Sequence, residues 1–446
     1  MGTVCPTCAA LRRRIAEPEA QLAEALCAGK RQAAPFAKGP PQSQPKQPGR
    51  KPGKDYGRKG HRPPPPPTHI DEVHEAPLPA ACPDCGGPLD ETDIQQQYQV
   101  EIPRRPIHRQ FNVHVGHCRC CARRVQGRHP LQTSDALGAA AAQLGSDAQA
   151  AVVDLNKQAG LSHGKVTQVL HNLFGIDLTR GGSAHTVLRA GRRAEGVFQS
   201  LLDRVPTTER ANVDETGWRV GGRLAWLHTI VTPDVTAYLI DPTRSGAVAE
   251  RVLGPGYAGL LGHDGWSVYD RFVQARHQQC LAHLLRRCDE LLQTATAGAV
   301  LFPRRVKSLL EQALELRDRH QAGQVSDHGA VVACGRLTNR LADLVYPAKR
   351  HAANERFAQH LWNHRDELFT FLKYPAIEAT NWLAEHAIRF GVILRKVWGG
   401  NRTWAGARAQ SVLMSFWRTC WQQGRSALDS MSQLLRGQAV LLVQPP

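Results

Sequence analysis

Two aspartates of the chain occupy positions from which they could bind divalent metal ions. Asp214 lies in a stretch of apolar and β-favouring residues that begins at Ala211, and Asp264 ends an apolar run that begins at Gly259. Carboxylates are the hard oxygen ligands that Mg²⁺ prefers, and two such ions can activate a nucleophilic oxygen and stabilise a leaving oxygen in phosphodiester chemistry. Acids at strand ends are also common in turns and caps, so both interpretations stay open here.

A third acid, Glu385, lies in a segment with helical spacing. Asn381, Glu385 and Arg389 are four residues apart and therefore share one face of a helix. An ion pair on a solvated helix would have the same spacing. The segment that follows mixes cations with tryptophans and glycines, which suits phosphate contact and base stacking, although tryptophans fit a core equally well. Its candidate DNA-binding cations are Arg395, Lys396 and Arg402.

Two pairs of cysteines with the spacing Cys-x-x-Cys suit a structural zinc ion. Four thiolates from two such pairs form a tetrahedral zinc ribbon, and paired cysteines in a chain without a secretion signal indicate metal rather than disulfides. The preferred ligands are Cys82, Cys85, Cys118 and Cys121. Cys120 or His117 could replace one member of the second pair.

The residues from Asp147 to Phe174 predict a helix, a turn at Gly160 and a second helix. A glycine-containing turn between two short helices fits a helix-turn-helix that reads DNA, but a plain helical hairpin has the same pattern. If the second helix enters a groove, the residues that would face the DNA are Lys165, Gln168, His171 and Asn172.

The composition favours a nucleic-acid partner. The 446 residues include 56 Lys and Arg against 39 Asp and Glu, which gives a net charge of +17. Such a charge attracts polyanions, although solubility accounts for part of it. There is no apolar run of membrane-spanning length and no signal peptide at the N-terminus, so we expect a cytoplasmic protein without membrane contact.

Several stretches predict a mixed α/β sheet. Residues 211–216, 225–231 and 237–240 read as strands, residues 244–253 as a helix and residues 259–265 as a further strand. The acids thus lie on the first strand and at the end of the fourth.

Residues 277–375 predict a helical insertion, because apolar residues such as Val306, Leu309, Leu310 and Ala313 repeat at helical spacing. Cys280-x-x-His283 opens it, and two possible ligands do not close a zinc site, so we expect a packing role. The expected domains are a helical leader (1–29, interrupted by Pro18), a disordered basic Pro/Gly-rich linker (30–77), a zinc-binding segment (78–130), a helix-turn-helix region (131–205), a first catalytic part (206–276), the insertion (277–375), a second catalytic part (376–425) and a C-terminal tail (426–446).

Motifs along most of the chain resemble the successive signatures of the insertion-sequence sixty-six family of DDE transposases. They are Asp214-Glu215-Thr216, His263-Asp264-Gly265-Trp266 with Tyr269, Cys280-Leu281-Ala282-His283, and the segment Asn381 to Arg389 with Arg395-Lys396. The N-terminal order of leader, basic linker, zinc segment and helix-turn-helix is also similar to that family. The chain departs from it at Glu385-His386, where the family usually has Glu-Arg, which would remove one phosphate contact.

The resemblance implies a ribonuclease-H-like catalytic domain in which Asp214, Asp264 and Glu385 hold two Mg²⁺ or Mn²⁺ ions. We therefore expect a transposase that binds double-stranded DNA at the element ends and at the target, as a homo-oligomer and with possible accessory proteins of the same element. Two alternatives stay open. One is a zinc-containing DNA-binding regulator derived from a transposase, and the other is a structure-selective nuclease with the same fold and metals.

Overall fold

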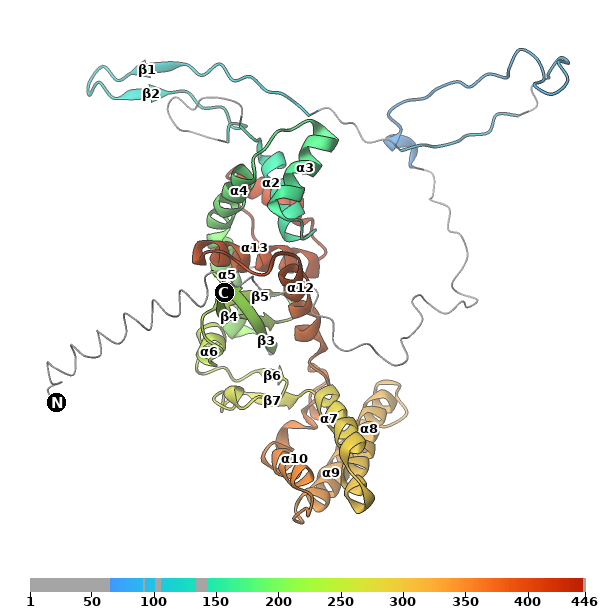
Figure 1. The fold of residues 1–446 in the computed structure, drawn as a ribbon, viewed down its shortest axis with the longest axis vertical. Coiled ribbons are helices and arrows are strands. Elements are labelled where there is room, and N and C mark those ends of the chain that lie inside the picture. Colours follow the sequence, from blue (N-terminus) through green and yellow to red (C-terminus); the bar gives the residue numbers. More distant parts are fainter. Residues whose placement is uncertain (1–64, 91–92, 101–105, 134–142, 444–446) are drawn as a thin grey trace. The chain divides into compact units, whose positions relative to one another are not determined.

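The computed structural model describes residues 65–90, 93–100, 106–133 and 143–443 (Figure 1). The predicted helical leader and the linker up to residue 64 lie outside the described residues. The chain forms two compact units, of which the smaller comprises residues 38–107 and 173–175. Every element named below belongs to the larger unit, except for the last residues of α3. No helix in the described part of the chain is long and apolar enough to cross a membrane.

A five-stranded mixed sheet confirms the expected α/β class. Its strands are β3 (Arg210–Val220), β4 (Arg223–Val231), β5 (Thr236–Asp241), β6 (Leu260–His263) and β7 (Arg276–Gln279). The order across the sheet is β5-β4-β3-β6-β7. β3, β4 and β5 form an antiparallel meander, whereas β6 pairs in parallel with β3 and β7 in parallel with β6. Gly221 and Gly222 both have positive φ, as a two-residue hairpin turn requires.

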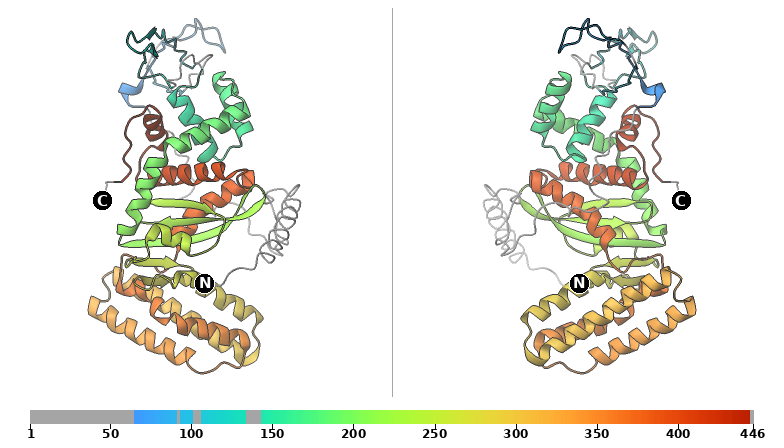
Figure 2. Two further views of the ribbon diagram at one scale, coloured as in Figure 1. Left: turned by 90° about the vertical axis from the view of Figure 1, so that its left-hand side faces the viewer. Right: turned by 90° about the vertical axis from the view of Figure 1, so that its right-hand side faces the viewer.

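Two long helices pack onto this sheet. α12 (Trp382–Trp398) packs against β3 and β4, and α13 (Trp404–Gln422) runs along β5 (Figure 2). The Tyr238 hydroxyl on β5 donates to the carbonyl oxygen of Ala387 at 2.7 Å. The backbone N–H of Tyr238 donates to the Ser415 hydroxyl of α13 at 2.8 Å. Because these bonds join the helices to the sheet, α12 has little freedom to slide.

Five further helices lie outside the sheet and the insertion. Four of them precede β3 in the sequence, and the fifth follows α13. They are α2 (Ser146–Lys157), α3 (His163–Phe174), α4 (Arg180–Arg193), α5 (Glu195–Arg204) and α14 (Ala427–Leu435). Between α2 and α3 the chain turns at Gly160, and the Asn156 amide closes the turn by donating to the carbonyl of Leu161 at 2.8 Å. α14 lies in the expected tail and packs against α2, where Arg436 pairs with Asp147.

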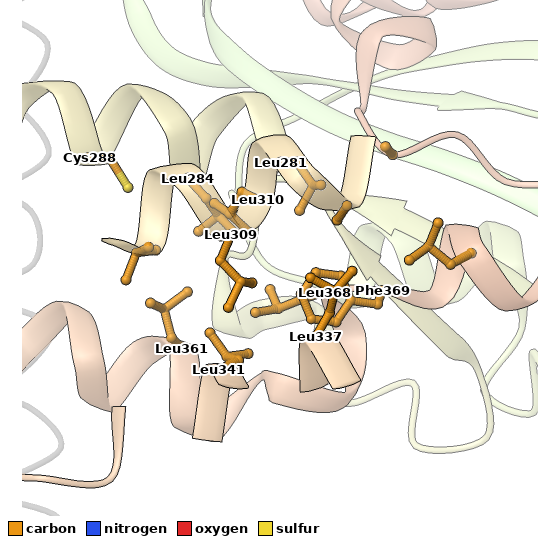
Figure 3. Close-up of a cluster of buried hydrophobic side chains, with 14 of the residues drawn as sticks. Leu281, Leu284, Cys288, Leu309, Leu310, Leu337, Leu341, Leu361, Leu368 and Phe369 are labelled. Carbon is orange, nitrogen blue, oxygen red and sulfur yellow. The ribbon is translucent and has the colours of Figure 1, made fainter. Parts of the chain in front are cut away.

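Helices fill most of the expected insertion, but its predicted start is wrong, because residues 277–279 belong to β7 of the sheet. The helices lie between β7 and α12. They are α7 (Leu281–Thr294), α8 (Leu301–Gln321), α9 (Asp327–Val345), α10 (Ala352–Asn363) and the short α11 (Thr370–Lys373). The helices of the insertion enclose an apolar core that includes Leu284, Leu309, Leu310, Leu341 and Leu361 and extends to Leu260 on β6 (Figure 3). Helical spacing of leucine and valine thus predicts both the helices and the face that each one buries.

Candidate active site

The three predicted acids come from elements that are joined at the centre of the sheet. Asp214 lies on β3, and Asp264 directly follows β6, the parallel neighbour of β3. Glu385 lies in the first turn of α12, which packs on β3. The backbone N–H of Glu215 donates to Asp214 at 2.9 Å, and that of Trp266 donates to Asp264 at 3.0 Å. Both aspartate side chains are therefore held close to their own backbone.

Asn381 fixes the start of α12 against the sheet. Its amide nitrogen donates to the carbonyl of Val213 at 2.8 Å, and its amide oxygen accepts from Asn212 at 2.9 Å. Asn381 is buried and precedes the first helical residue, so it acts as an anchor for the helix rather than as part of an exposed face. Gly262 on β6 leaves room for this contact, because an added Cβ would lie 2.3 Å from the Asn212 amide nitrogen.

Asp214 lies in a region of crowded negative charge. Burial, followed by the nearby carboxylates of Glu215, Asp264 and Glu385, raises the pKa of Asp214 to about 7. Repulsion of this kind weakens with distance, so Asp264 and Glu385 lie near enough to act on Asp214. Among the described residues, however, the three acids are not one of the groups whose ligand atoms all lie within 4.8 Å of one another. A divalent cation would relieve the repulsion, and carboxylates are its usual ligands. The donor set therefore fits Mg²⁺ or Mn²⁺.

Glu385 has two further neighbours that were expected to be packing residues. The Cys280 Sγ lies 3.7 Å from Glu385 Oε1, and His283 Nδ1 lies 3.4 Å from the same oxygen. The ligand atoms of these three residues lie within 4.8 Å of one another. The Cys-x-x-His motif at the start of α7 therefore contacts the third acid directly. The sequence contains the motif, but the motif itself does not reveal which residue it contacts.

Glu215 is a buried carboxylate that sequence reasoning did not single out. Its side chain is 1% exposed, Arg244 donates to Oε1 at 2.7 and 3.1 Å, and the Tyr269 hydroxyl donates to Oε2 at 2.5 Å. The Arg244 guanidinium also lies over two indole rings, 4.8 Å from Trp226 and 3.9 Å from Trp266. Both oxygens of Glu215 thus accept hydrogen bonds, and the Arg244 guanidinium balances its charge.

Gln279, at the end of β7, supports the loop that follows Asp264. Its amide nitrogen donates to Glu367 at 3.1 Å, and its amide oxygen accepts from His360 at 3.1 Å. Gly265 passes directly over this side chain, since an added Cβ would lie 2.9 Å from the amide oxygen. His360 and Glu367 belong to the insertion. The fully buried Gln279 therefore lies between the insertion and the loop that follows Asp264.

His263 and His277 also lie beneath the loop and, together with Glu367, could be mistaken for a metal site. The His263 Nδ1 accepts from the backbone N–H of Gly265 at 3.1 Å, so its Nε2 is the donor to His277 Nδ1 at 2.9 Å. The other ring nitrogen of His277 donates to the carbonyl of Phe272 at 2.9 Å. All four ring nitrogens thus have hydrogen-bond partners, which leaves no lone pair for a metal.

The predicted DNA-contacting residues differ in their exposure. Lys165, Gln168, His171 and Asn172 are all exposed on α3, whose opposite face is buried. Arg389, Lys396 and Arg402 are exposed as well. Arg395 is half-buried, and its guanidinium donates to the backbone carbonyl of Gly217 on β3. Arg395 therefore attaches the end of α12 to the sheet.

The two cysteine pairs form loops with the same hydrogen bonds. The backbone N–H of Cys82 donates to the carbonyl of the fifth residue after it at 2.9 Å, and the carbonyl of Cys82 accepts from the fourth at 2.8 Å. Cys118 repeats both bonds, each at 2.9 Å, next to the hairpin of β1 (Val115–His117) and β2 (Arg124–Gln126). In each loop backbone N–H groups, chiefly that of the second cysteine (Cys85 or Cys121), lower the pKa of the first thiol. Each loop favours the thiolate form that zinc requires.

A family model described as Transposase IS66 family matches residues 142–409. The match covers more than half of the chain, so the protein belongs to the IS66 family of transposases. Membership implies a DNA-processing enzyme that uses divalent metal. The matched range contains Asp214, Asp264 and Glu385, together with α2 and α3, and it excludes both cysteine pairs. None of the curated proteins compared with the chain matches it.

Proposed function

We propose that the protein binds the terminal inverted repeats of an insertion sequence, nicks their ends and joins the freed 3′-hydroxyls to target DNA. The observation that carries the proposal is the placement of the three acids: Asp214 lies on β3, Asp264 directly follows β6, the parallel neighbour of β3, and Glu385 lies in the first turn of α12, which packs on β3. The strand order, an antiparallel meander followed by two parallel strands, supports a ribonuclease-H-like catalytic domain.

Two divalent ions bound by these acids would supply Lewis-acid activation of the attacking oxygen and stabilise the leaving one. In the nicking step water attacks the phosphorus, its proton passes to solvent, and the bond to the 3′-oxygen breaks to give a 3′-hydroxyl. In the joining step this hydroxyl attacks a target phosphate and displaces the target's 3′-oxygen. The protein's part is positioning: Asn381 keeps Glu385 near β3, and Gln279 supports the Asp264 loop.

Recognition of the DNA is assigned to two exposed surfaces. Lys165, Gln168 and Asn172 lie on one face of α3 and would read a groove, as in a helix-turn-helix protein. The exposed Arg389, Lys396 and Arg402 would contact phosphates. Arg395 is bound to β3 and is not part of this surface. Because an element has two ends, we propose that a homo-oligomer assembles on the DNA.

We also propose that Cys82, Cys85, Cys118 and Cys121 bind one structural zinc ion. The shared loop geometry supports this set, since it gives each pair the same first and fourth positions. Metal analysis of the purified protein should find one zinc ion per chain, and Cys118→Ser should lose it. Cys120→Ser is the matched control, because Cys120 is exposed and lies outside the set. Equal zinc in both variants would reject this assignment.

The catalytic proposal is tested with DNA that flanks the coding region. The full-length protein with Mg²⁺ or Mn²⁺ should nick the 3′ ends of this DNA and then form joined strands. We expect Asp214→Asn, Asp264→Asn and Glu385→Gln each to lower nicking by a factor on the order of 10³, because each removes a carboxylate ligand. Nicking near the wild-type rate in Asp214→Asn or Glu385→Gln would show that the acids are wrongly assigned.

The same assay separates the two alternatives. Tight binding without cleavage favours a DNA-binding regulator, in which the acids have no catalytic task. Cleavage without joined strands favours a structure-selective nuclease.

A further inference from the structure

A row of aromatic rings crosses the outer sides of α12 and α13. The ring centroid of Trp382 lies 6.3 Å from that of His386, and His386 lies 6.3 Å from Trp421. The guanidinium carbon of Arg418 lies 4.0 Å from the centre of the Trp421 ring. We call these four side chains the aromatic ladder. It joins residues of two helices that are far apart in the sequence.

The three rings of the ladder are exposed, in contrast to tryptophans of the core. Trp382 is 49% exposed and Trp421 is 58% exposed, whereas Trp218 and Trp417 are almost fully buried. A single exposed aromatic residue is ordinary, but contiguous rings at the surface present flat apolar faces that a partner can cover. The ladder therefore has the shape of a stacking surface.

The charges of the ladder define what could stack on it. Arg418 donates to His386 Nδ1 at 2.8 Å, so a neutral His386 carries its proton on Nε2 and can donate a further hydrogen bond. Arg389 is exposed one turn further along α12. The ladder itself contains no acid. Flat apolar faces beside hydrogen-bond donors and cations complement a ligand that combines negative charge with flat rings. A nucleic-acid strand with unpaired bases is such a ligand.

The position of the ladder relates it to the proposed cleavage site. Trp382 precedes Glu385 by three residues in α12, and side chains with this spacing lie on adjacent turns of a helix. We propose that the aromatic ladder binds unpaired DNA nucleotides next to the phosphate that is cut. This inference rests on the proposed function, because it takes Glu385 to mark the cut phosphate. Bases in an intact duplex hide their faces, so the ladder would select single-stranded or locally opened DNA.

The test measures DNA binding in EDTA, where metal-dependent cleavage cannot occur. A single-stranded oligonucleotide with one 2-aminopurine and the corresponding duplex are titrated with full-length protein. We expect Trp382→Ala and Trp421→Ala each to weaken single-strand binding about ten-fold, and Trp421→Phe to keep most of it. Duplex affinity should change less than about two-fold, since duplex binding depends mainly on phosphate contacts. The 2-aminopurine fluorescence should be quenched by the wild type and not by the alanine variants.

Tyr346→Ala is the matched control, because Tyr346 is 79% exposed and packs against Trp362 in the insertion. It should leave single-strand binding unchanged. The proposal is overturned if Tyr346→Ala weakens binding as much as the ladder variants, or if duplex binding falls equally. A change in the oligomeric state without a change in DNA binding would also overturn it, since the ladder would then be a protein contact. None of these results depends on cleavage, so they are distinct from failure of the catalytic proposal.

Discussion

The insertion and the site beside the sheet are stabilised in different ways. The core of the insertion is a cluster of apolar side chains, among them leucines, phenylalanines, valines, alanines and cysteines (Figure 3). The site buries polar groups instead: Glu215 binds Arg244 and Tyr269, and Asn381 binds β3. Apolar burial is not directional, whereas hydrogen bonds fix an angle as well as a distance. From this difference we expect the insertion core to contribute mainly to stability and the hydrogen bonds of the site mainly to orientation.

One junction between the two regions is Gln279. Its side chain forms hydrogen bonds with His360 and Glu367 of the insertion and lies next to the loop that follows Asp264. If the comparison is right, damage to the insertion core should lower stability first. Damage to the junction should lower activity first. The predictions below separate these two outcomes, and the first has the largest expected effect.

Leu309→Ala should lower the free energy of unfolding by about 2–5 kcal/mol. Leu309 is fully buried on α8, and its truncation removes apolar contacts and leaves a cavity. Leu301→Ala on the same helix is the control, because Leu301 is 49% exposed and should cost about 1 kcal/mol or less. Denaturant unfolding followed by circular dichroism compares the two. Equal losses would mean that the insertion does not have the tight core assigned to it.

Gln279→Ala should lower the rate of end nicking by about 10–100-fold, the range seen when a residue that supports a metal ligand is removed. The Asp264 loop loses its support, so the variant should also need a higher Mg²⁺ concentration for half-maximal rate. A purely structural role would not change that concentration. Gln359→Ala on α10 is the control, because Gln359 is exposed and bonds only within its helix, to Asn363. If both variants behave alike, the junction does not position Asp264.

Much of this architecture could be predicted from the sequence. Apolar stretches predict the strands that carry Asp214 and end at Asp264, and helical spacing predicts the insertion. β7 was missed because Arg276-His277-Gln278-Gln279 has no apolar residue. Its last two residues, Gln278 and Gln279, are buried and form side-chain hydrogen bonds, such as the one from Gln278 to the carbonyl of Leu368 at 3.2 Å. Secondary-structure propensity does not predict burial that depends on hydrogen bonds between polar side chains.

The contacts around Glu385 lay beyond sequence reasoning for another reason. Its neighbours Cys280 and His283 are about a hundred residues away along the chain, on the other side of the insertion, and the aromatic ladder joins His386 to Trp421 on a different helix. Local periodicity predicts on which face of its own helix or strand a residue lies. It does not predict which residues of another element contact that face. Only the resemblance connected the three acids before the fold was known.

The smallest expected effect concerns charge, which the site has and the insertion core lacks. The pKa of Asp214 is raised to about 7 from 3.8, so the folded protein binds a proton that the unfolded chain has released. Stability must then fall as pH rises through that interval, by about 1 kcal/mol between pH 6 and pH 8. Burial lowers the pKa of His263 to about 3 and that of His360 to about 4, which works in the opposite direction below their usual value of 6.5.

The informative quantity is therefore the difference between the wild type and Asp214→Asn, in which the histidine contributions cancel. In EDTA the advantage of Asp214→Asn over the wild type should grow from pH 6 to pH 8 in thermal unfolding. Mg²⁺ should raise the stability of the wild type more than that of the variant, because a bound cation replaces the proton. The cost of Leu309→Ala should be the same at both pH values. If the stability difference between the wild type and Asp214→Asn does not depend on pH, the pKa of Asp214 is not raised by burial and neighbouring acids. Charge would then distinguish the site from the insertion core no further.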